Sequence, residues 1–163
     1  MVAERKTERR TETGPDAGDV RALFDGAVFR SVGRAVSMGV MEFTGPDGRE
    51  VALHIQCRFR ILHKDRVIIG SQDMRYPRKG AGADAFDAFQ TMYDTNAEKL
   101  TGVLGEARPR VAGVTLGRAG ALTLDCEHGF AIEVFPDCSG PFEAWRAFAR
   151  PDGDHLGYPP ELL

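Results

Sequence analysis

The sequence predicts a single α+β domain: a mainly antiparallel sheet of about seven or eight strands, with one or two helices packed on it. Three observations predict this class. Apolar and polar residues alternate in several short segments, Gly and Pro residues that form turns lie between these segments, and one longer segment has helical spacing. Strands and helices do not alternate along the chain as they do in a parallel sheet. A sheet of this size can also curl or close into a barrel.

The segment 122–134 gives the clearest strand signal. Apolar residues alternate with other residues on both sides of a short loop, at Leu122, Leu124, Cys126, Phe130, Ile132 and Val134. A loop of three residues, 127–129, pairs Cys126 with Phe130 and puts all six apolar side chains on one face. We expect a type I turn followed by a left-handed residue, a conformation that Gly129 adopts without a Cβ clash.

Further strands are expected on both sides of this hairpin, at residues 32–43, 53–61, 66–70, 111–116, 142–149 and 154–158. Gly33 and Gly39 indicate a bulge or bend within the first of them. Pro-Asp-Gly sequences predict chain reversals at 45–48 and 150–153. The alternation in 53–61 is unbroken and predicts one continuous strand with an apolar core face.

One helix is expected between Asp84, as a possible cap, and Gly105, as a stop signal. Its apolar stripe would pack on the sheet and consists of Phe86, Phe89, Tyr93, Ala97, Leu100 and Leu104. Thr91, Thr95 and Asn96 weaken its middle, so two shorter helices are an alternative. Residues 20–24 can form a short helical turn or a strand.

The length of 163 residues fits one domain with room for a core. Residues 1–18 are rich in charge and poor in large apolar side chains, so we expect a disordered charged tail, and residues 19–163 form the folded domain. No apolar run is long enough for a membrane helix, and no signal peptide is recognised, so we expect a cytoplasmic protein. Three cysteines do not make a disulfide framework.

Positive charge is concentrated in residues 58–79, where seven cations face two acids, a local net charge of +5 in a chain of net charge −3. The seven cations form a candidate partner-binding surface: Arg58, Arg60, Lys64, Arg66, Arg75, Arg78 and Lys79. Arginine offers planar contacts with several donors, so this surface can bind an acidic protein partner. The alternative is a solvated basic face. The net negative charge of the whole chain argues against nucleic acid as the partner.

The sequence contains no enzyme signature, and no cofactor or metal is expected. The two close Cys/His pairs, His54 with Cys57 and Cys126 with His128, do not converge on an ion in the predicted strands. The loop 137–140 contains Asp137, Cys138 and Ser139, which could act with a histidine from elsewhere in the chain. An ordinary polar loop is the favoured interpretation.

Residues 143–145 spell Glu-Ala-Trp at the start of an expected strand. Trp is highly buried on average, so Trp145 is predicted to plug the sheet while Glu143 holds a neighbouring loop. An exposed Trp145 that anchors a ligand is the alternative.

The order of these C-terminal motifs resembles a known pattern. The Gly120–Leu124 strand start, the His128-Gly129 hairpin and the Glu143-Ala144-Trp145 signature are similar to a bacterial, mainly actinobacterial, family of small proteins of unknown function. The resemblance covers residues 53–163; this sequence departs from it by placing His128 where an acid is commoner. The resemblance implies the fold and carries over no catalytic residue.

These observations favour a non-catalytic module that binds another protein, with an immunity or regulatory role in a bacterial toxin system as an analogy. The alternative is a small-molecule-binding protein or hydrolase that uses the loop 137–140. An inert oligomeric scaffold is a third hypothesis, and the oligomeric state is left open by the sequence.

Overall fold

A computed structural model describes residues 14–159 of the chain, which form two antiparallel five-stranded sheets and two α-helices. The strands of the first sheet follow the order β1-β2-β3-β9-β10 and comprise Val28–Ala35, Met38–Thr44, Glu50–Ile55, Trp145–Ala149 and Leu156–Tyr158. The strands of the second follow the order β5-β4-β8-β7-β6 and comprise Arg66–Gly70, Arg58–His63, Phe130–Phe135, Leu122–Cys126 and Val111–Leu116. The α+β class and the antiparallel pairing predicted from the sequence are therefore confirmed.

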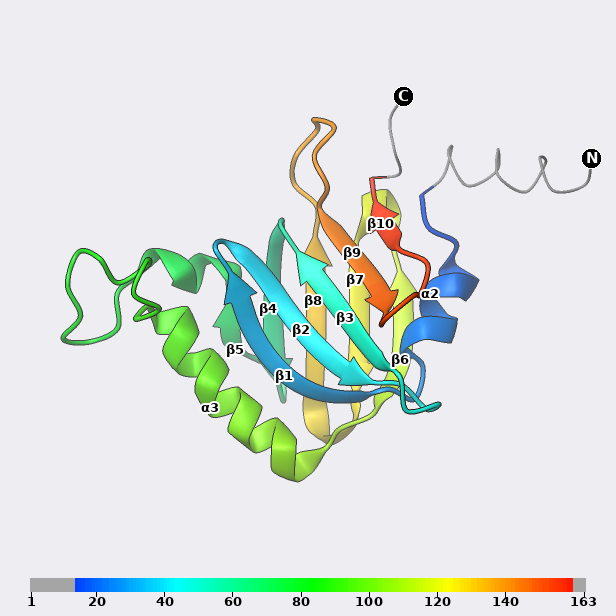
Figure 1. Ribbon diagram of the computed structural model, residues 1–163, viewed down its shortest axis with the longest axis horizontal. Helices are drawn as coiled ribbons and strands as arrows, with labels where there is room; N and C mark the ends of the chain where they lie inside the picture. Colours follow the sequence, from blue (N-terminus) through cyan, green and yellow to red (C-terminus); the bar gives the residue numbers. More distant parts are fainter. Residues whose placement is uncertain (1–13, 160–163) are drawn as a thin grey trace, which may run out of the picture.

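The two sheets lie one behind the other and their strands cross (Figure 1). Each sheet turns its apolar face inward, and one continuous core fills the space between them. Its largest fully buried side chains include Trp145, Tyr93, Phe24, Phe29 and Phe43. The sheets are not closed into a barrel, and the described residues contain ten strands rather than seven or eight. The extra strands come from segments that were expected to be single strands.

The prediction of one strand over 53–61 is wrong. The chain leaves the first sheet after Ile55 and enters the second sheet at Arg58. Between them the amides of Gln56 and Cys57 both donate to the Ala144 carbonyl, at 2.7 and 3.2 Å. The alternation continued through this crossover because the residues on both sides of it point into the same core, so periodicity could not reveal the break.

The expected strand at 32–43 is instead a hairpin of β1 and β2. Its turn contains Val36 at a φ of 53°, an unfavourable conformation for a β-branched residue, and has no Gly, Pro or Asn to announce it. The irregularity in this ladder lies between Phe29 and Ser31, not at the glycines. Gly39 allows the sheets to approach, since a Cβ there would lie 2.6 Å from the Phe59 ring.

Helix α3 spans Met92–Ala107, so the predicted start near Asp84 and stop at Gly105 are wrong. Thr91 is the N-cap, and its hydroxyl accepts from the Asp94 amide while the Asp94 carboxylate accepts from the Thr91 amide. This reciprocal capping box stabilises the first turn. The helix packs Tyr93, Ala97, Leu100 and Leu104 into the core, as predicted, whereas Phe86 and Phe89 lie in the turns before it.

Helix α2 spans Ala17–Phe24 and buries Val20 and Phe24 against the core. It begins at Ala17, so the last two residues of the predicted tail 1–18 belong to this helix, and residues 1–13 of that predicted tail lie outside the described part of the chain. Neither α-helix in residues 14–159 is long and apolar enough to span a membrane.

The register of the β7–β8 hairpin is confirmed: Leu122 pairs with Val134 and Leu124 with Ile132. Gly129 has the expected positive φ, 81°, but His128 is left-handed as well, with a φ of 63°, so the turn is not the expected type I turn. Trp145 at the start of β9 is fully buried and donates from Nε1 to the Gly120 carbonyl at 2.7 Å. The interpretation of Trp145 as a plug is therefore the correct one.

Candidate functional site

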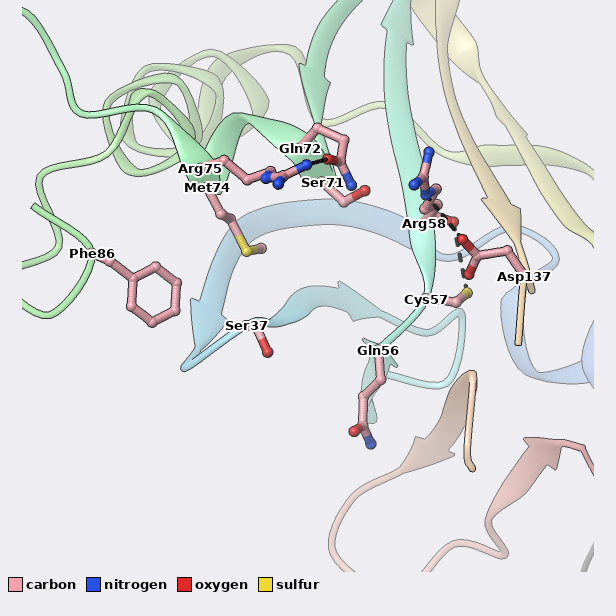
Figure 2. Close-up of a pocket in the computed structure, with 10 residues that line it drawn as sticks. All are labelled: Ser37, Gln56, Cys57, Arg58, Ser71, Gln72, Met74, Arg75, Phe86 and Asp137. Carbon is pink, nitrogen blue, oxygen red and sulfur yellow. Dashed lines mark hydrogen bonds and ion pairs between the residues drawn. The ribbon is translucent and has the colours of Figure 1, made fainter. Parts of the chain in front are cut away.

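A cleft of about 660 Å³ opens where the chain crosses between the sheets (Figure 2). It is bordered by the β1–β2 turn, the β3–β4 crossover, the short 3₁₀ helix η1 (Ser71–Arg75), the turns before α3 and the loop after β8. The residues that line it are mainly polar and comprise Ser37, Gln56, Cys57, Arg58, Ser71, Gln72, Met74, Arg75, Phe86 and Asp137. We name this site the crossover cleft.

One wall of the crossover cleft depends on Arg34 of β1. The side chain of Arg34 is only 1% exposed and forms a two-pronged ion pair with Asp94, at 2.7 and 2.9 Å. It also donates to the Val36 and Phe86 carbonyls, and its guanidinium stacks between the Phe86 and Phe89 rings at 4.3 and 4.1 Å. Arg34 thus fixes the hairpin turn, the segment before α3 and the start of α3 together.

Arg75 lies at the end of η1 and its side chain is exposed in the cleft. Within the described part of the chain, the one hydrogen bond of this side chain goes to the neutral amide oxygen of Gln72, at 3.1 Å. A guanidinium has five N–H donors, so most of the donors of Arg75 face solvent. No carboxylate of residues 14–159 neutralises this charge by an ion pair.

Arg58 borders the opposite side of the cleft, at the start of β4 (Figure 2). Its Nε lies 2.9 Å from Asp137, in an ion pair whose side chains are 64% and 47% exposed. Such exposed pairs contribute little to stability and can exchange partners. Cys57 lies beside this pair. Its burial, and to a smaller extent the negative charge of Asp137, raise the pKa of the Cys57 thiol to about 12. Cys57 is therefore a neutral thiol near pH 7 rather than a nucleophilic thiolate.

The structure brings together two of the seven predicted cations, Arg58 and Arg75, in the cleft. Arg60, also on β4, pairs with Glu133 at 3.3 Å and lies over the Phe135 ring. The other four are exposed outside the cleft lining: Lys64 in the β4–β5 turn, Arg66 on β5, and Arg78 and Lys79 after η1. The predicted basic segment is thus divided among several places.

Glu143 forms a close ion pair with Arg146, at 2.7 and 2.8 Å, instead of holding a neighbouring loop. In the loop 137–140, Asp137 is engaged with Arg58, and the Cys138 sulfur accepts from the Gly140 amide at 3.4 Å.

The four histidines of the chain lie in two other places. His54 and His155 pack on the Phe148 ring, and His63 and His128 line a different hollow. No hydrogen bond in residues 14–159 joins a histidine to Cys138 or Ser139. That same range contains no group of three or more Cys, His, Asp or Glu residues placed to hold a metal ion.

Nothing in the sequence indicated that the polar residues Ser37, Gln56 and Gln72 line a cleft. Phe86 was expected on the core-facing stripe of a helix, and it lies in the cleft wall instead. The polar residues have no distinctive pattern, because the cleft is created by the crossover between sheets. The Arg34–Asp94 pair, 60 residues apart in the chain, was also missed. The one signal in the sequence for this pair was the Thr91-x-x-Asp94 capping box, because such a box marks the start of a helix.

Comparison of this chain with models of protein families, with curated proteins and with solved structures finds no match. The resemblance to the actinobacterial family therefore stays a prediction. The function has to be argued from the geometry of the cleft.

Proposed function

We propose that the protein is a non-catalytic binding module that recognises an acidic segment of another protein in the crossover cleft. The observation that carries this proposal is the Arg75 guanidinium, which is held in an open cleft with a neutral amide as its partner. A carboxylate of an incoming chain can take its free donors in a planar, two-pronged contact. Arg58 stands across the cleft as a second contact for the same chain.

The rest of the lining suits a peptide better than a reacting small molecule. Side-chain amides of Gln56 and Gln72 can bind backbone carbonyls and amides, because each amide both donates and accepts. Met74 and Phe86 supply apolar surface for a neighbouring side chain. This combination of a few charged contacts and adaptable polar groups is typical of a recognition surface.

The hydrolase alternative has less support. Its nucleophiles, Cys138 and Ser139, have no hydrogen bond to a histidine in the described residues, and activation of such a nucleophile requires an adjacent base. That alternative, like a specific role as an immunity or regulatory protein, stays a prediction.

A selection from displayed random peptides tests the proposal. Peptides are selected on the wild-type protein and on an Arg58→Glu, Arg75→Glu variant, with Arg66→Glu as the matched control. Arg66 carries the same charge and is exposed on β5, outside the cleft. We expect enrichment of peptides rich in Asp and Glu on the wild type and on the control, and loss of that enrichment on the double variant.

Equal unfolding temperatures of the three proteins would show that the substitutions leave the fold intact. Acidic peptides that bind the double variant as well as the wild type would overturn the proposal. So would enrichment of peptides without acidic residues.

A further inference from the structure

A second hollow, of about 470 Å³, lies between one flank of α3 and the edge of the second sheet. Its floor and walls are mainly apolar and include Ile68, Ile69, Leu100, Val103 and Phe130. The helix contributes residues from a single stripe, from Asn96 to Ala107, whose members recur at helical spacing. We name it the helix pocket.

The helix pocket differs from an ordinary packing defect in the polar groups at its border. Lys99 comes from α3, His63 from the end of β4, and His128 from the β7–β8 turn. Asn96 adds a neutral amide, and the residues that line this pocket include no Asp or Glu. The apolar interior therefore faces a border that carries positive charge and hydrogen-bond donors.

The shape of the pocket is held by the sheet and the helix together. His63 and Phe130 are directly paired across β4 and β8, and their rings stack at 4.4 Å with an interplanar angle of 26°. Phe130 and Leu100 are almost completely buried, whereas the Val103 side chain is half exposed. A ligand that covers Val103 would remove apolar surface from water, which favours binding.

We infer that the helix pocket binds a small amphipathic anion, a molecule with one carboxylate and an apolar body. The carboxylate lies toward Lys99 and the two imidazoles, and the body lies against Val103, Leu100 and Ile68. The volume is within the range of small-molecule sites, which are mostly apolar with a few converging polar groups. This site shares no lining residue with the crossover cleft and does not depend on the function proposed for that cleft.

Three probes with the same chain length test the inference: octanoate, octanol and octylammonium. We expect saturable binding of octanoate, measured by calorimetry and by thermal stabilisation, with weaker binding of octanol and weakest binding of octylammonium. Lys99→Gln should reduce the affinity for octanoate by about two- to fivefold, the range of one partly exposed ion pair, without a matching loss for octanol. Lys79→Gln, outside the pocket lining, is the matched control.

Val103→Glu is the second variant, because Val103 is half exposed and a charged side chain at this position can reach solvent. It places a carboxylate among the apolar contacts of the ligand, so binding of octanoate should become undetectable while the unfolding temperature stays close to that of the wild type. Absence of saturable octanoate binding to the wild type would overturn the inference. Equal affinities for octanoate and octanol, or binding that survives Val103→Glu, would do the same.

Discussion

Arg34 and Arg75 lie on either side of the Phe86 wall of the crossover cleft: Arg34 supports it from within, and Arg75 lines the cleft with it. The two guanidinium groups have opposite roles. Arg34 directs its donors inward to Asp94 and two backbone carbonyls, and the Phe86 and Phe89 rings cover its two faces. Arg75 lines the crossover cleft with Phe86 but is exposed and has one neutral hydrogen-bond partner in the described chain. A saturated, buried guanidinium stabilises the fold, whereas one with open donors is available to a ligand.

The largest expected effect is on the buried member of this pair. Arg34→Met should lower the free energy of unfolding by about 3–5 kcal/mol, because it leaves the Asp94 carboxylate without its buried partner. Arg30→Met on the same strand is the matched control, since Arg30 is 44% exposed and its contact with Glu50 is 3.8 Å long. Urea unfolding measures both. A loss of stability for Arg34→Met no larger than that for Arg30→Met would show that Arg34 does not support the fold.

The ion pair also predicts how stability depends on pH. Burial acts to raise the pKa of Asp94, but hydrogen bonds from Arg34 and Thr91 outweigh it, so the folded-state pKa lies below the usual value. A depressed pKa gives stability that is complete above about pH 4, the usual range of an unfolded aspartate, and is lost as pH falls through the folded value. Asp94→Asn should therefore be less stable than wild type at neutral pH, and the difference should narrow below about pH 4. A difference that is constant with pH in urea unfolding would contradict this assignment.

Arg75→Met should have only a small effect on the stability of the fold. The side chain is exposed and its one partner in residues 14–159, Gln72, is exposed as well, so we expect a change within about 0.5 kcal/mol in the same urea experiment. Binding of acidic peptides should be lost in parallel. A destabilisation close to that of Arg34→Met would show that Arg75 supports the fold.

A smaller effect on peptide binding than that of Arg75→Met is expected at Asp137, the carboxylate that pairs with Arg58. An incoming acidic segment competes with Asp137 for that guanidinium. Asp137→Asn should therefore raise the affinity for an acidic peptide by about two- to fivefold, the range of an exposed ion pair. Glu127→Gln is the matched control, because Glu127 pairs with Arg110 outside the cleft lining. Fluorescence titration with an acidic peptide measures both variants. An unchanged or reduced affinity for Asp137→Asn would place Arg58 outside the recognition site.

Sequence periodicity predicted the local elements well where a turn signal separated them. The strands β5, β6, β7 and β8 lie close to their expected bounds, and the β7–β8 register is correct because a shift by one residue would expose the apolar face. The division into two sheets could not be predicted. Ile55 and Phe59 are buried on either side of the crossover, so the alternation gave no sign of a change of sheet.

The site was predicted in part. The excess of cations in 58–79 drew attention to Arg58 and Arg75, but their convergence on one cleft depends on how η1 folds back beside β4. Arg60 appeared equivalent to Arg58 in the sequence, yet it lies beside Glu133 on the neighbouring strand. A charge count along the chain cannot separate these cases, because ion-pair partners come from distant segments.

The most direct test of recognition at the crossover cleft is an amide NMR titration of the wild-type protein. The probe is a soluble peptide of alternating Glu and Ser, compared with the same peptide carrying Gln in place of Glu. If the cleft recognises acidic segments, the acidic peptide alone shifts the signals of Gln56, Arg58, Gln72 and Arg75. These shifts are then lost in Arg75→Glu and kept in Arg66→Glu. Shifts centred on Lys64 and Arg66, or equal shifts with the two peptides, would contradict it.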